Sequence, residues 1–261
     1  MELMLPAERR QKILDVIARE LTIRVSSLSE MLGVSEMTIR RDLDCLAERG
    51  LVERTHGGAV FIKGRTPGKF QYQNSVQTNP DQRTRIARTA ATLIEPLDMV
   101  YLGEGASTAE MMHFIDPEMP FTIFTNNLGV VSQVRDQAAE LIVLGGAYSP
   151  ETHALAGPIT MEQIRQINAS KVFLGVDGLS LRSGLTTPNL DIAVIERSMI
   201  QYTRGTVIAM ADHSKFGLVA EVVVAPTHQI DIIVTDQKMP HGFQKDLEQL
   251  GVEVIVANAT K

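Results

Sequence analysis

Apolar residues recur at helical spacing near the start of the chain and predict two short helices. Pro6 suits a first helical turn, and the spacing after it predicts one buried stripe. That stripe consists of Ile13, Val16, Ile17 and Leu21. Ser27 and Glu30 then match a capping box, so we expect a second helix of barely two turns that ends at Gly33.

A third helix follows after a tight turn. Ser35 caps its start and Gly50 closes its end. Apolar positions at i, i+4 and i+7 predict its buried face, formed by Ile39, Leu43 and Leu46. The opposite face is polar and carries paired arginines.

Two short runs joined by glycines predict a β-hairpin next. The runs are Leu51 to Arg54 and Ala59 to Ile62, with His56, Gly57 and Gly58 between them. Because glycine allows the positive φ values of a tight turn, we interpret this hairpin as the wing of a winged helix-turn-helix domain spanning residues 1–62. Residues 63–80 are polar, contain glycine and proline, and predict a linker.

The rest of the chain, residues 81–261, alternates apolar runs with helical patterns. Continuous apolar strands alternating with helices predict an α/β domain with a mostly parallel sheet covered on both faces. The expected strands are Met99 to Leu102, Phe121 to Thr125, Leu141 to Leu144, Lys171 to Val176, Thr206 to Ala211, Ile230 to Thr235 and Val252 to Val256.

Composition narrows the possible partners. The 261 residues are 44% hydrophobic, enough for two separate cores, and the formal net charge is −6. Residues 1–65 carry 11 Lys and Arg against 10 Asp and Glu, so only this part is expected to bind a polyanion. Cys45 is the only cysteine, which excludes an intramolecular disulfide and a cysteine cluster for zinc, and we expect it to pack beside Leu46.

The chain shows no signal for a membrane or the exterior. No apolar run approaches the roughly 20 residues of a membrane helix, and the start of the chain does not form a signal peptide. We therefore expect a cytoplasmic protein, and the sequence predicts neither a metal site nor a cofactor.

The third helix has the properties of a DNA-reading helix. A short helix, a glycine turn and a second capped helix hold the latter's N-terminal half where it can enter the major groove. With Ile39 and Leu43 buried, the side chains left to face DNA are those of Ser35, Met37, Thr38, Arg40 and Arg41. Arginine can bind guanine or phosphate, and the sequence does not decide which arginine does which.

Two other interpretations of this region are weaker. A three-helix module that binds proteins would not require caps, paired arginines and a glycine wing in this order. A nucleoid-type structural DNA binder is disfavoured by the acidic remainder of the chain and by the absence of basic tails.

These residues resemble the DeoR family of bacterial regulators. The resemblance rests on the runs V-S-E-M-T-I-R-R-D-L-D-C-L from Val34 to Leu46 and G-L-V-E-R-T-H-G-G-A from Gly50 to Ala59. It implies operator binding by the helix from Ser35. It also implies that a wing at His56, Gly57 and Gly58 reaches the flanking backbone or minor groove.

A glycine-rich loop after the first large-domain strand is a candidate anion site. It joins a strand to a helix, a position where backbone N–H groups and hydroxyls can bind phosphate. Its residues are Gly103, Glu104, Gly105, Ala106, Ser107 and Thr108. Such a loop alone is weak support, because glycines often serve only turn geometry.

Other strand ends add polar residues that would share one edge of a parallel sheet, where ligands bind. These are Asn126, Asn127, Gly146, Asp177 and Lys215. Lys215 can neutralise a phosphate or carboxylate, and the two asparagines and Asp177 can bond sugar hydroxyls. Each residue alone is also explained as a turn or a helix cap.

The resemblance extends over these segments through T-N-N-L, L-G-G, V-F-L-G-V-D-G, G-L-T-T-P-N, A-D-H-S-K-F-G and I-V-T-D. It implies a sensor domain similar in fold to ribose-5-phosphate isomerase that responds to a phosphorylated sugar or related metabolite. Members carry an acidic or amide residue where Gly103 stands and Ser or Thr where Ala106 stands. Here the acid is Glu104, which repels a phosphate unless it points away or contacts hydroxyls.

The prediction is a repressor of a carbohydrate-metabolism operon that binds double-stranded operator DNA and is released by its effector. One reader helix contacts few base pairs, so we expect a homo-oligomer, a dimer or a tetramer. The rival hypothesis is a sugar-phosphate isomerase using Asp177, Glu104 and Lys215. We disfavour it because we find no clear second carboxylate in the crevice and an isomerase needs no DNA reader. We therefore do not expect an enzyme.

Overall fold

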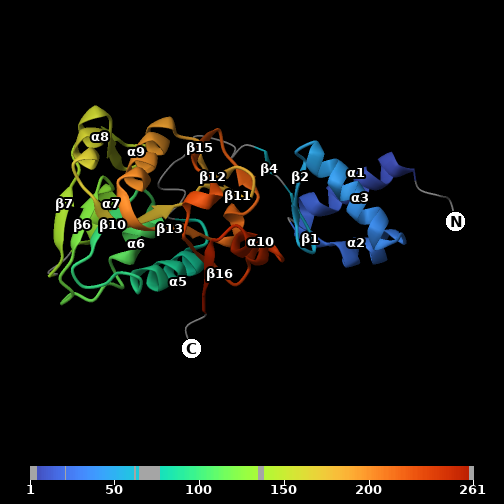
Figure 1. Cartoon of the computed structure of the whole chain (residues 1–261), viewed down its shortest axis with the longest axis horizontal. Helices are drawn as coiled ribbons and strands as arrows, with labels where there is room; N and C mark the ends of the chain where they lie inside the picture. The colour runs from blue at the N-terminus through green and yellow to red at the C-terminus, as the bar shows by residue number, and fades with distance from the viewer. Residues whose placement is uncertain (1–4, 21, 62, 65–76, 135–137, 259–261) are drawn as a thin grey trace.

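The computed structural model describes residues 5–20, 22–61, 63–64, 77–134 and 138–258 of the chain. Figure 1 shows a small N-terminal domain beside a larger α/β domain, with the chain ends on different domains. Leu21, Ile62 and residues 65–76 of the predicted linker lie outside the described residues. Of the predicted linker, Lys63–Gly64 forms the short strand β4, and Pro80 already begins a helix.

The N-terminal domain has the predicted three helices and hairpin, with one additional strand. Its elements are α1 (Pro6–Glu20), β1 (Thr22–Arg24), α2 (Val25–Leu32), α3 (Glu36–Glu48), β2 (Val52–Thr55) and β3 (Gly58–Phe61). The predicted apolar stripes meet in one core, which contains the fully buried Ile13, Ile17, Ile39 and Leu43. β1 pairs with β3 and widens the hairpin to three strands.

The helix boundaries correct one predicted cap and confirm two. Helix α2 starts two residues before Ser27, its N-cap is Arg24 without a side-chain bond, and the predicted capping box is therefore wrong. Gly33 ends this helix at φ 63°, as predicted. Ser35 caps α3 by accepting a hydrogen bond from the Thr38 N–H. The local pattern missed the start of α2 because β1 leads directly into that helix.

The wing turn is tighter than predicted, and its glycines have a different role. Strands β2 and β3 leave only His56 and Gly57 between them. Neither Gly57 nor Gly58 adopts a positive φ, so the predicted reason for these glycines is wrong. Gly58 is required by close approach instead, because a Cβ there would collide with the Ile23 carbonyl of the neighbouring strand β1.

The large domain contains the predicted parallel sheet, and all seven predicted strands are present. Its strand order is β17-β16-β13-β10-β5-β6-β7, with parallel pairing throughout. The strands are β5 (Met99–Leu102), β6 (Thr122–Thr125), β7 (Glu140–Val143), β10 (Ala169–Gly175), β13 (Thr203–Ala211), β16 (Ile232–Asp236) and β17 (Glu253–Ala257). The order reverses between β5 and β10, and a crevice forms at such a point.

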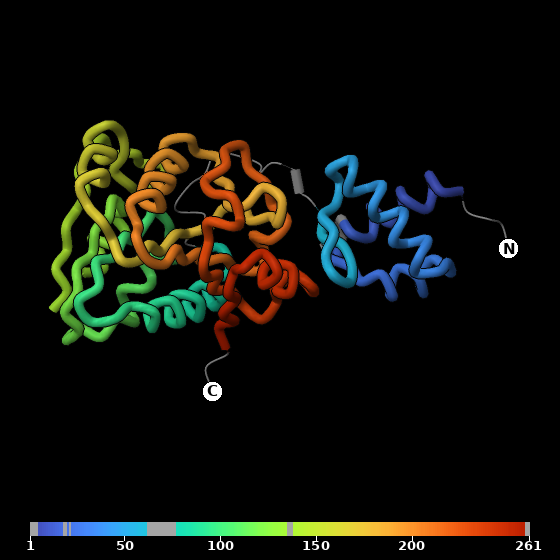
Figure 2. Tube along the Cα trace, viewed as in Figure 1, coloured from blue at the N-terminus to red at the C-terminus, as the bar shows by residue number. Residues whose placement is uncertain are grey.

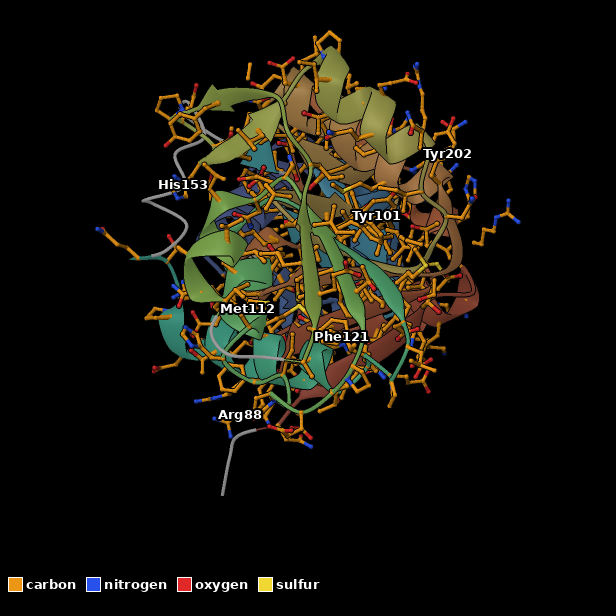
Figure 3. All side chains as sticks on the ribbon, turned by 90° about the vertical axis from the view of Figure 1, so that its left-hand side faces the viewer. Arg88, Tyr101, Met112, Phe121, His153 and Tyr202 are labelled. Carbon is orange, nitrogen blue, oxygen red and sulfur yellow. The ribbon has the colours of Figure 1, made fainter. Side chains whose placement is uncertain are left out.

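Helices cover both faces of this sheet. One face packs on α5 (Pro80–Ala91), α6 (Ala106–Met111) and α7 (Leu128–Gln133), and the other on α8 (Pro158–Arg165), α9 (Leu190–Gln201) and α10 (Phe243–Gln249). Successive strand residues alternate between the two cores, as a pleated strand requires. In Figure 3, Tyr101 and Tyr202 lie on one side of the sheet, and Met112 and Phe121 on the other.

Three small sheets were not predicted. They are β11 (Gly178–Ser180), β12 (Gly184–Thr187) and β15 (Val222–Ala225) in one antiparallel sheet, β8 (Ala147–Ser149) with β9 (Ala154–Ala156), and β14 (Leu218–Val219) with β4. The last pair joins the large domain to the chain segment that leaves the wing. The trace in Figure 2 shows the same arrangement, with the C-terminal part of the chain near the wing.

Candidate functional site

The predicted DNA-reading residues lie together on the outer side of the N-terminal half of α3. Ser35, Met37, Arg40 and Arg41 are exposed, and Thr38 is half-buried. Met37 is the most exposed of the large apolar side chains on this helix, at 71%. Arg40 forms an ion pair with Glu36, one turn away, at 3.3 Å, and both side chains remain open to solvent. Their contact with DNA stays a prediction.

Two ion pairs hold this helix in place, and sequence reasoning missed both. Arg9 of α1 pairs with the buried Asp42 of α3 at 2.6 Å, and Arg54 of β2 pairs with Asp44 at 2.9 Å. Arg9 and Asp42 are both largely withdrawn from solvent, so their pairing fixes the register of α1 on α3. The sequence contains a signal for the first pair, because Asp42 stands directly before the buried Leu43.

The wing tip lies against the large domain. The His56 backbone N–H donates to one carboxylate oxygen of Asp246 at 3.0 Å, and the His56 ring Nδ1 lies 2.7 Å from the other. Gln249 of α10 contacts the opposite ring nitrogen. A Cβ on Gly57 would touch His241, also from the large domain. His56 and Gly57 therefore face the large domain in this structure, and their predicted contacts with DNA stay predictions.

The wing also contributes to the large domain's core. Val60 of β3 is fully buried within the cluster that contains Phe216 and Phe243. The Glu53 carboxylate accepts a hydrogen bond from the Arg182 backbone at 2.8 Å, and burial raises the pKa of Glu53. The two domains are therefore joined through their cores as well as through the linker.

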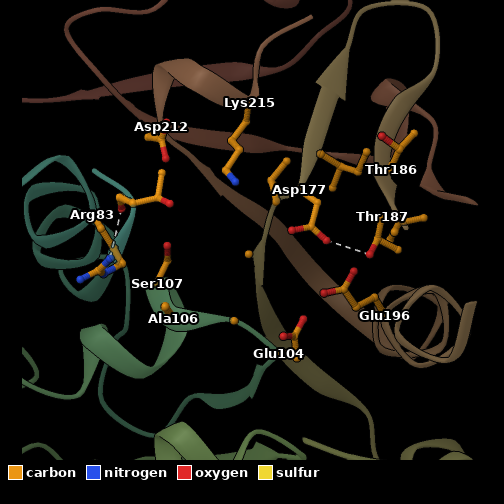
Figure 4. A pocket seen from close by; sticks show the side chains of 16 residues that line it. Arg83, Glu104, Ala106, Ser107, Asp177, Thr186, Thr187, Glu196, Asp212 and Lys215 are labelled. Carbon is orange, nitrogen blue, oxygen red and sulfur yellow. Dashed lines mark hydrogen bonds between the residues drawn. The ribbon is translucent and has the colours of Figure 1, made fainter. Parts of the chain in front are cut away.

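A cleft opens at the reversal point of the sheet, where β5, β10 and β13 end. It encloses about 680 Å³, including the part open to solvent. Figure 4 shows Ser107 and Lys215 pointing into it from two different elements. The predicted effector residues that line it are Glu104, Gly105, Ala106, Ser107, Asp177 and Lys215.

The remaining predicted effector residues lie outside this lining, and two of them, Asn127 and Thr108, brace the loop from behind. Asn127 donates through its amide to the carbonyls of Gly103 and Gly105, at 3.2 and 2.9 Å. Thr108 donates through its hydroxyl to the same two carbonyls. Asn126 donates to Leu155 instead. Direct effector contact by these residues stays a prediction.

Gly146 also lies outside the cleft lining. A Cβ there would collide with Thr160 and the Ala156 carbonyl, and its φ is 157°. The structure thus gives this glycine a packing reason in the β8–β9 region. Its predicted role in effector binding stays a prediction, because Gly146 does not line the cleft.

Several lining residues were not predicted from the sequence. They include Thr78, Arg83, Thr187, Glu196 and Asp212. Glu196 offered a signal, because it is an acid on the buried stripe of α9, four residues after Ile192 and three before Met199. The others come from segments whose approach to the cleft is decided by the tertiary fold.

Glu196 corrects one step of the sequence argument. From the sequence, no clear second carboxylate is expected in the crevice, but the cleft is lined by Glu104, Asp177 and Glu196 together. That reason for rejecting an isomerase is therefore wrong. Glu196 was overlooked because it lies on a helix and not at a strand end.

Burial controls the charge of these acids. It raises the pKa of Glu104 well above its ordinary value, and the neighbouring charges of Asp177 and Glu196 raise it further. Burial raises the pKa of Glu196 in the same way, with Asp177 adding to the effect. Burial also raises the pKa of Asp177, although Lys215 and a 2.8 Å hydrogen bond from Thr187 act in the opposite direction.

The cationic side of the cleft consists of Lys215 and Arg83. Arg83 already pairs with Glu110 at 3.5 Å, so Lys215 is the better candidate to bind an anion. Helix α6 has only six residues, which leaves the predicted phosphate loop with little support from a helix dipole. An anion here would depend chiefly on Lys215 and the Ser107 hydroxyl.

The absence of a side chain at Gly103 has a steric reason. A Cβ there would lie 2.9 Å from a Leu174 methyl and 3.7 Å from a carboxylate oxygen of Glu196. Glu196 therefore brings an acid close to the position where the resemblance led us to expect one. The carboxyl group near this position therefore belongs to a side chain of α9 and not to the loop itself.

One group of side chains has spacing suited to a metal. Asp212, His213 and Asp236 can place one ligand atom each within 4.8 Å of one another. Their oxygens are already used by the protein, since Asp236 accepts from the His213 backbone and Asp212 from Asn79 and the Ser214 backbone. We read this group as caps of strand ends.

Within the described ranges, no helix is long and apolar enough to cross a membrane.

Two family models match the chain in consecutive segments. The model described as a DeoR-like helix-turn-helix domain matches residues 9–65. The model described as the DeoR C terminal sensor domain matches residues 78–237, more than half of the chain. The two matches correspond to the two structural domains.

Similar proteins align over nearly their whole length. The HTH-type transcriptional regulator GlpR of Haloferax volcanii is 33% identical, with 97% of this chain and 98% of that protein covered. A putative aga operon transcriptional repressor of Escherichia coli O157:H7 is 29% identical, with 96% and 93% covered. The uncharacterized HTH-type transcriptional regulator FruR of Bacillus subtilis is 32% identical, with 89% and 92% covered.

Solved structures show more distant similarity. A probable sor operon regulator from Shigella flexneri has a TM-score of 0.41 and 13% identity, with 66% of this chain and 88% of that chain covered. Ribose 5-phosphate isomerase A from Methanocaldococcus jannaschii has a TM-score of 0.40 and 14% identity, with 53% and 55% covered.

Proposed function

This chain belongs to the DeoR family of transcriptional regulators, and we propose that it represses a carbohydrate-metabolism operon until a phosphorylated sugar or related metabolite binds the cleft of its sensor domain. DNA binding through a helix-turn-helix domain follows from the family. A regulator of this kind works on chromosomal DNA, so the proposal includes a cytoplasmic location. The family also argues against the isomerase, because its members regulate transcription and are not enzymes.

Operator recognition is assigned to the outer face of α3. Arg40 and Arg41 are exposed there beside Met37, and arginine pairs with guanine or holds phosphates in the major groove. The Glu36 partner of Arg40 is exposed and one turn away, so this ion pair can break at little cost when DNA offers a stronger one. We propose that Ser35 and Thr38, whose hydroxyls can donate hydrogen bonds, contact phosphates.

One observation carries the regulatory part of the proposal, namely the short path from the cleft to the wing. Lys215 lines the cleft, and only two residues later Gly217 lies so close to Val60 and Phe61 that no side chain would fit. The next residues, β14, pair with β4 at the exit of the wing. Movement of Lys215 toward an anion would therefore displace the wing and the attached reader helix.

The direction of control follows from differential affinity. An effector shifts the regulator toward the form that it binds better, and it releases operator DNA if that form holds the reader helices in the wrong place. The printed name of the aga operon relative includes the word repressor. We therefore propose repression relieved by the effector.

A single α3 contacts only a few base pairs, so specific binding requires two or more copies on spaced half-sites. We accordingly propose a homo-oligomer, either a dimer or a tetramer. Light scattering at micromolar concentration tests this, and a strictly monomeric protein would contradict it.

The full proposal is tested with the operator region of the chain's own gene cluster. Fluorescence anisotropy at fixed salt measures operator affinity of the full chain with and without a panel of sugar phosphates. We expect at least one compound to weaken operator binding by tenfold or more and to stabilise the protein against heat. If no compound that binds the cleft changes operator affinity, the proposed regulation is wrong.

A further inference from the structure

The inner part of the cleft has an unusual charge composition. Three carboxyl groups face one another there, from the loop after β5 (Glu104), the end of β10 (Asp177) and helix α9 (Glu196). Glu104 and Glu196 are only 5% and 4% exposed. Lys215 acts on Asp177, but no cation within the described ranges acts on either glutamate. Folding alone would not favour this arrangement, because buried like charges repel.

The Glu104 carboxylate provides a second, independent observation. Its Oε1 is buried and has no hydrogen-bond partner among the described residues, although the side chain lines the cleft. In Figure 4, Glu104, Asp177 and Glu196 lie around the same part of the cleft, while Lys215 and Ser107 lie toward the other part. A buried acceptor without a donor costs stability, and a ligand that donates to it would recover that cost.

The spacing of the acids indicates what kind of donor fits. Within the described part of the chain, only Asp212, His213 and Asp236 bring ligand atoms within 4.8 Å of one another, and the three cleft acids do not. They are therefore too spread out to enclose one bare metal ion. An organic ligand with a cationic group and further donors can reach them.

We propose that the effector is a phosphorylated metabolite that also carries a protonated amine, as an amino sugar phosphate does. Glu104 and Glu196 bind the ammonium group, and Asp177, held by Thr187, accepts from a neighbouring hydroxyl. Lys215 and Ser107 bind the phosphate. This inference deepens the proposed function, because it rests on the cleft being the effector site.

Charge and hydrogen-bond chemistry both favour the amine over a hydroxyl. An ammonium group carries three donors and a positive charge, whereas a hydroxyl carries one donor and no charge. Hydrogen bonds to charged groups stabilise a complex more than those between neutral groups. The ligand's two ends also match the two sides of the cleft, with its anion at Lys215 and its cation at the glutamates.

The first experiment compares matched pairs of sugar phosphates on the full-length chain. Glucosamine 6-phosphate is paired with glucose 6-phosphate, galactosamine 6-phosphate with galactose 6-phosphate, and mannosamine 6-phosphate with mannose 6-phosphate. Calorimetry at pH 7.5 should show at least tenfold tighter binding of the amine in one or more pairs. If no amine binds, or if the hydroxyl partner binds as tightly in every pair, the inference is overturned.

Charge-neutralising variants locate the preference. Glu104→Gln and Glu196→Gln keep the side-chain shape, and each should lower the amine preference at least tenfold. Asp191→Asn is the matched control, since Asp191 is an exposed acid at the start of the same helix α9. It should leave the preference unchanged. A glutamine variant that keeps the full preference overturns the assignment.

Proton release provides a test in the unaltered protein. Burial raises the pKa of both glutamates and so favours their protonated form in the empty cleft, and an ammonium group that favours the charged form should release protons on binding. Calorimetry in two buffers of different ionisation enthalpy measures this release. Release with the amine probe and none with its hydroxyl partner supports the inference, and equal release overturns it.

Operator binding separates the two proposals. Suppose that a sugar phosphate without an amine binds better than its amine partner and releases operator DNA. This result would overturn the amine inference while leaving the proposed function intact. An amine probe that binds through Glu104 and Glu196 but never changes operator affinity would do the reverse.

Discussion

The outer face of α3, the candidate DNA-binding surface, and the cleft, the candidate effector site, use charged residues in opposite ways. On α3, the candidate DNA-binding side chains come from one stretch of seven residues and are exposed or half-buried. In the cleft, the charged side chains come from at least four separate elements; Glu104 and Glu196 are buried and Asp177 is half-buried. A surface that must meet a large partner can stay solvated, whereas a cleft for a small ligand must remove its charges from water.

The two regions also differ in what keeps them stable. Arg40 and Glu36 form an exposed ion pair that adds little to stability, and α3 depends instead on Ile39, Leu43 and the buried Asp42. Burial of the cleft acids is expected to lower the stability of the protein, because it disfavours their charged form. The following predictions test this difference, in order of decreasing effect.

The largest effect is expected from breaking the anchor of α3. Asp42→Ala leaves Arg9 without its partner in a largely buried position and should lower the free energy of unfolding by about 3 kcal/mol. Urea denaturation followed by circular dichroism measures it. Asp44→Ala, on the same helix, removes only a largely exposed pair and should cost less than about 1 kcal/mol. Equal losses would contradict the importance of the buried pair.

Removing a candidate base or phosphate contact should affect DNA alone. Arg40→Ala is expected to weaken operator binding by about 2 kcal/mol, roughly thirtyfold, without changing the melting temperature. Anisotropy titration at fixed salt measures the change. Arg49→Ala provides the control, because Arg49 is exposed at the C-terminal end of the same helix. A thermally destabilised Arg40→Ala protein would mean that this arginine is structural.

The buried acids predict a stability that depends on pH. Because the folded-state pKa values of Glu104 and Glu196 are raised, the folded protein keeps protons that the unfolded chain has lost above pH 4.5. The free energy of unfolding should therefore fall as pH rises from about 5 to about 8, by about 1.4 kcal/mol for each unit of pKa elevation spanned.

Variants assign this pH dependence to the cleft. Glu104→Gln should make the decline in the free energy of unfolding between about pH 5 and about pH 8 distinctly smaller. Asp191→Asn should leave this decline as in the parent protein. Urea midpoints at both pH values provide the measurement. An unchanged slope in Glu104→Gln would show that this carboxyl group is ionised throughout the range.

Loss of the cleft cation should affect the effector alone. Lys215→Met is expected to weaken binding of phosphorylated ligands about tenfold and to leave operator affinity unchanged, because a charge-assisted hydrogen bond is lost. Thermal shift with the sugar phosphate panel measures it. Lys238→Met, an exposed lysine near the end of β16, should behave as the parent protein. An unaltered ligand response in Lys215→Met would place the effector elsewhere.

The smallest effect is expected where the wing contacts the large domain. Asp246→Ala removes the acceptor of the His56 N–H, a bond worth about 1 kcal/mol, so that amide should exchange with solvent about fivefold faster. Native-state hydrogen exchange measures the rate. Lys245→Ala, exposed on the same helix, is the control. No change in Asp246→Ala would mean that the wing does not depend on this contact.

Sequence patterns were most reliable where structure depends on near neighbours. The spacing of Ile39, Leu43 and Leu46 and the cap at Ser35 located α3, and apolar runs located all seven strands of the main sheet. The pattern failed at the start of α2 and at Gly58, where a strand from another part of the chain decides the conformation. Nor did it indicate that Asn127 supports the loop carbonyls from outside the cleft lining.

The sequence by itself determined the presence of a small helical domain and a larger α/β domain, the position of α3 and the succession of strands along the chain, because helical and strand periodicities and helix caps are properties of short segments. Only the tertiary structure decided that Glu196 joins Glu104 and Asp177, that Val60 packs in the sensor core, and that Lys215 is two residues from the wing contact. Charge repulsion, burial and close packing depend on distances between remote segments, and local spacing carries no information about those distances.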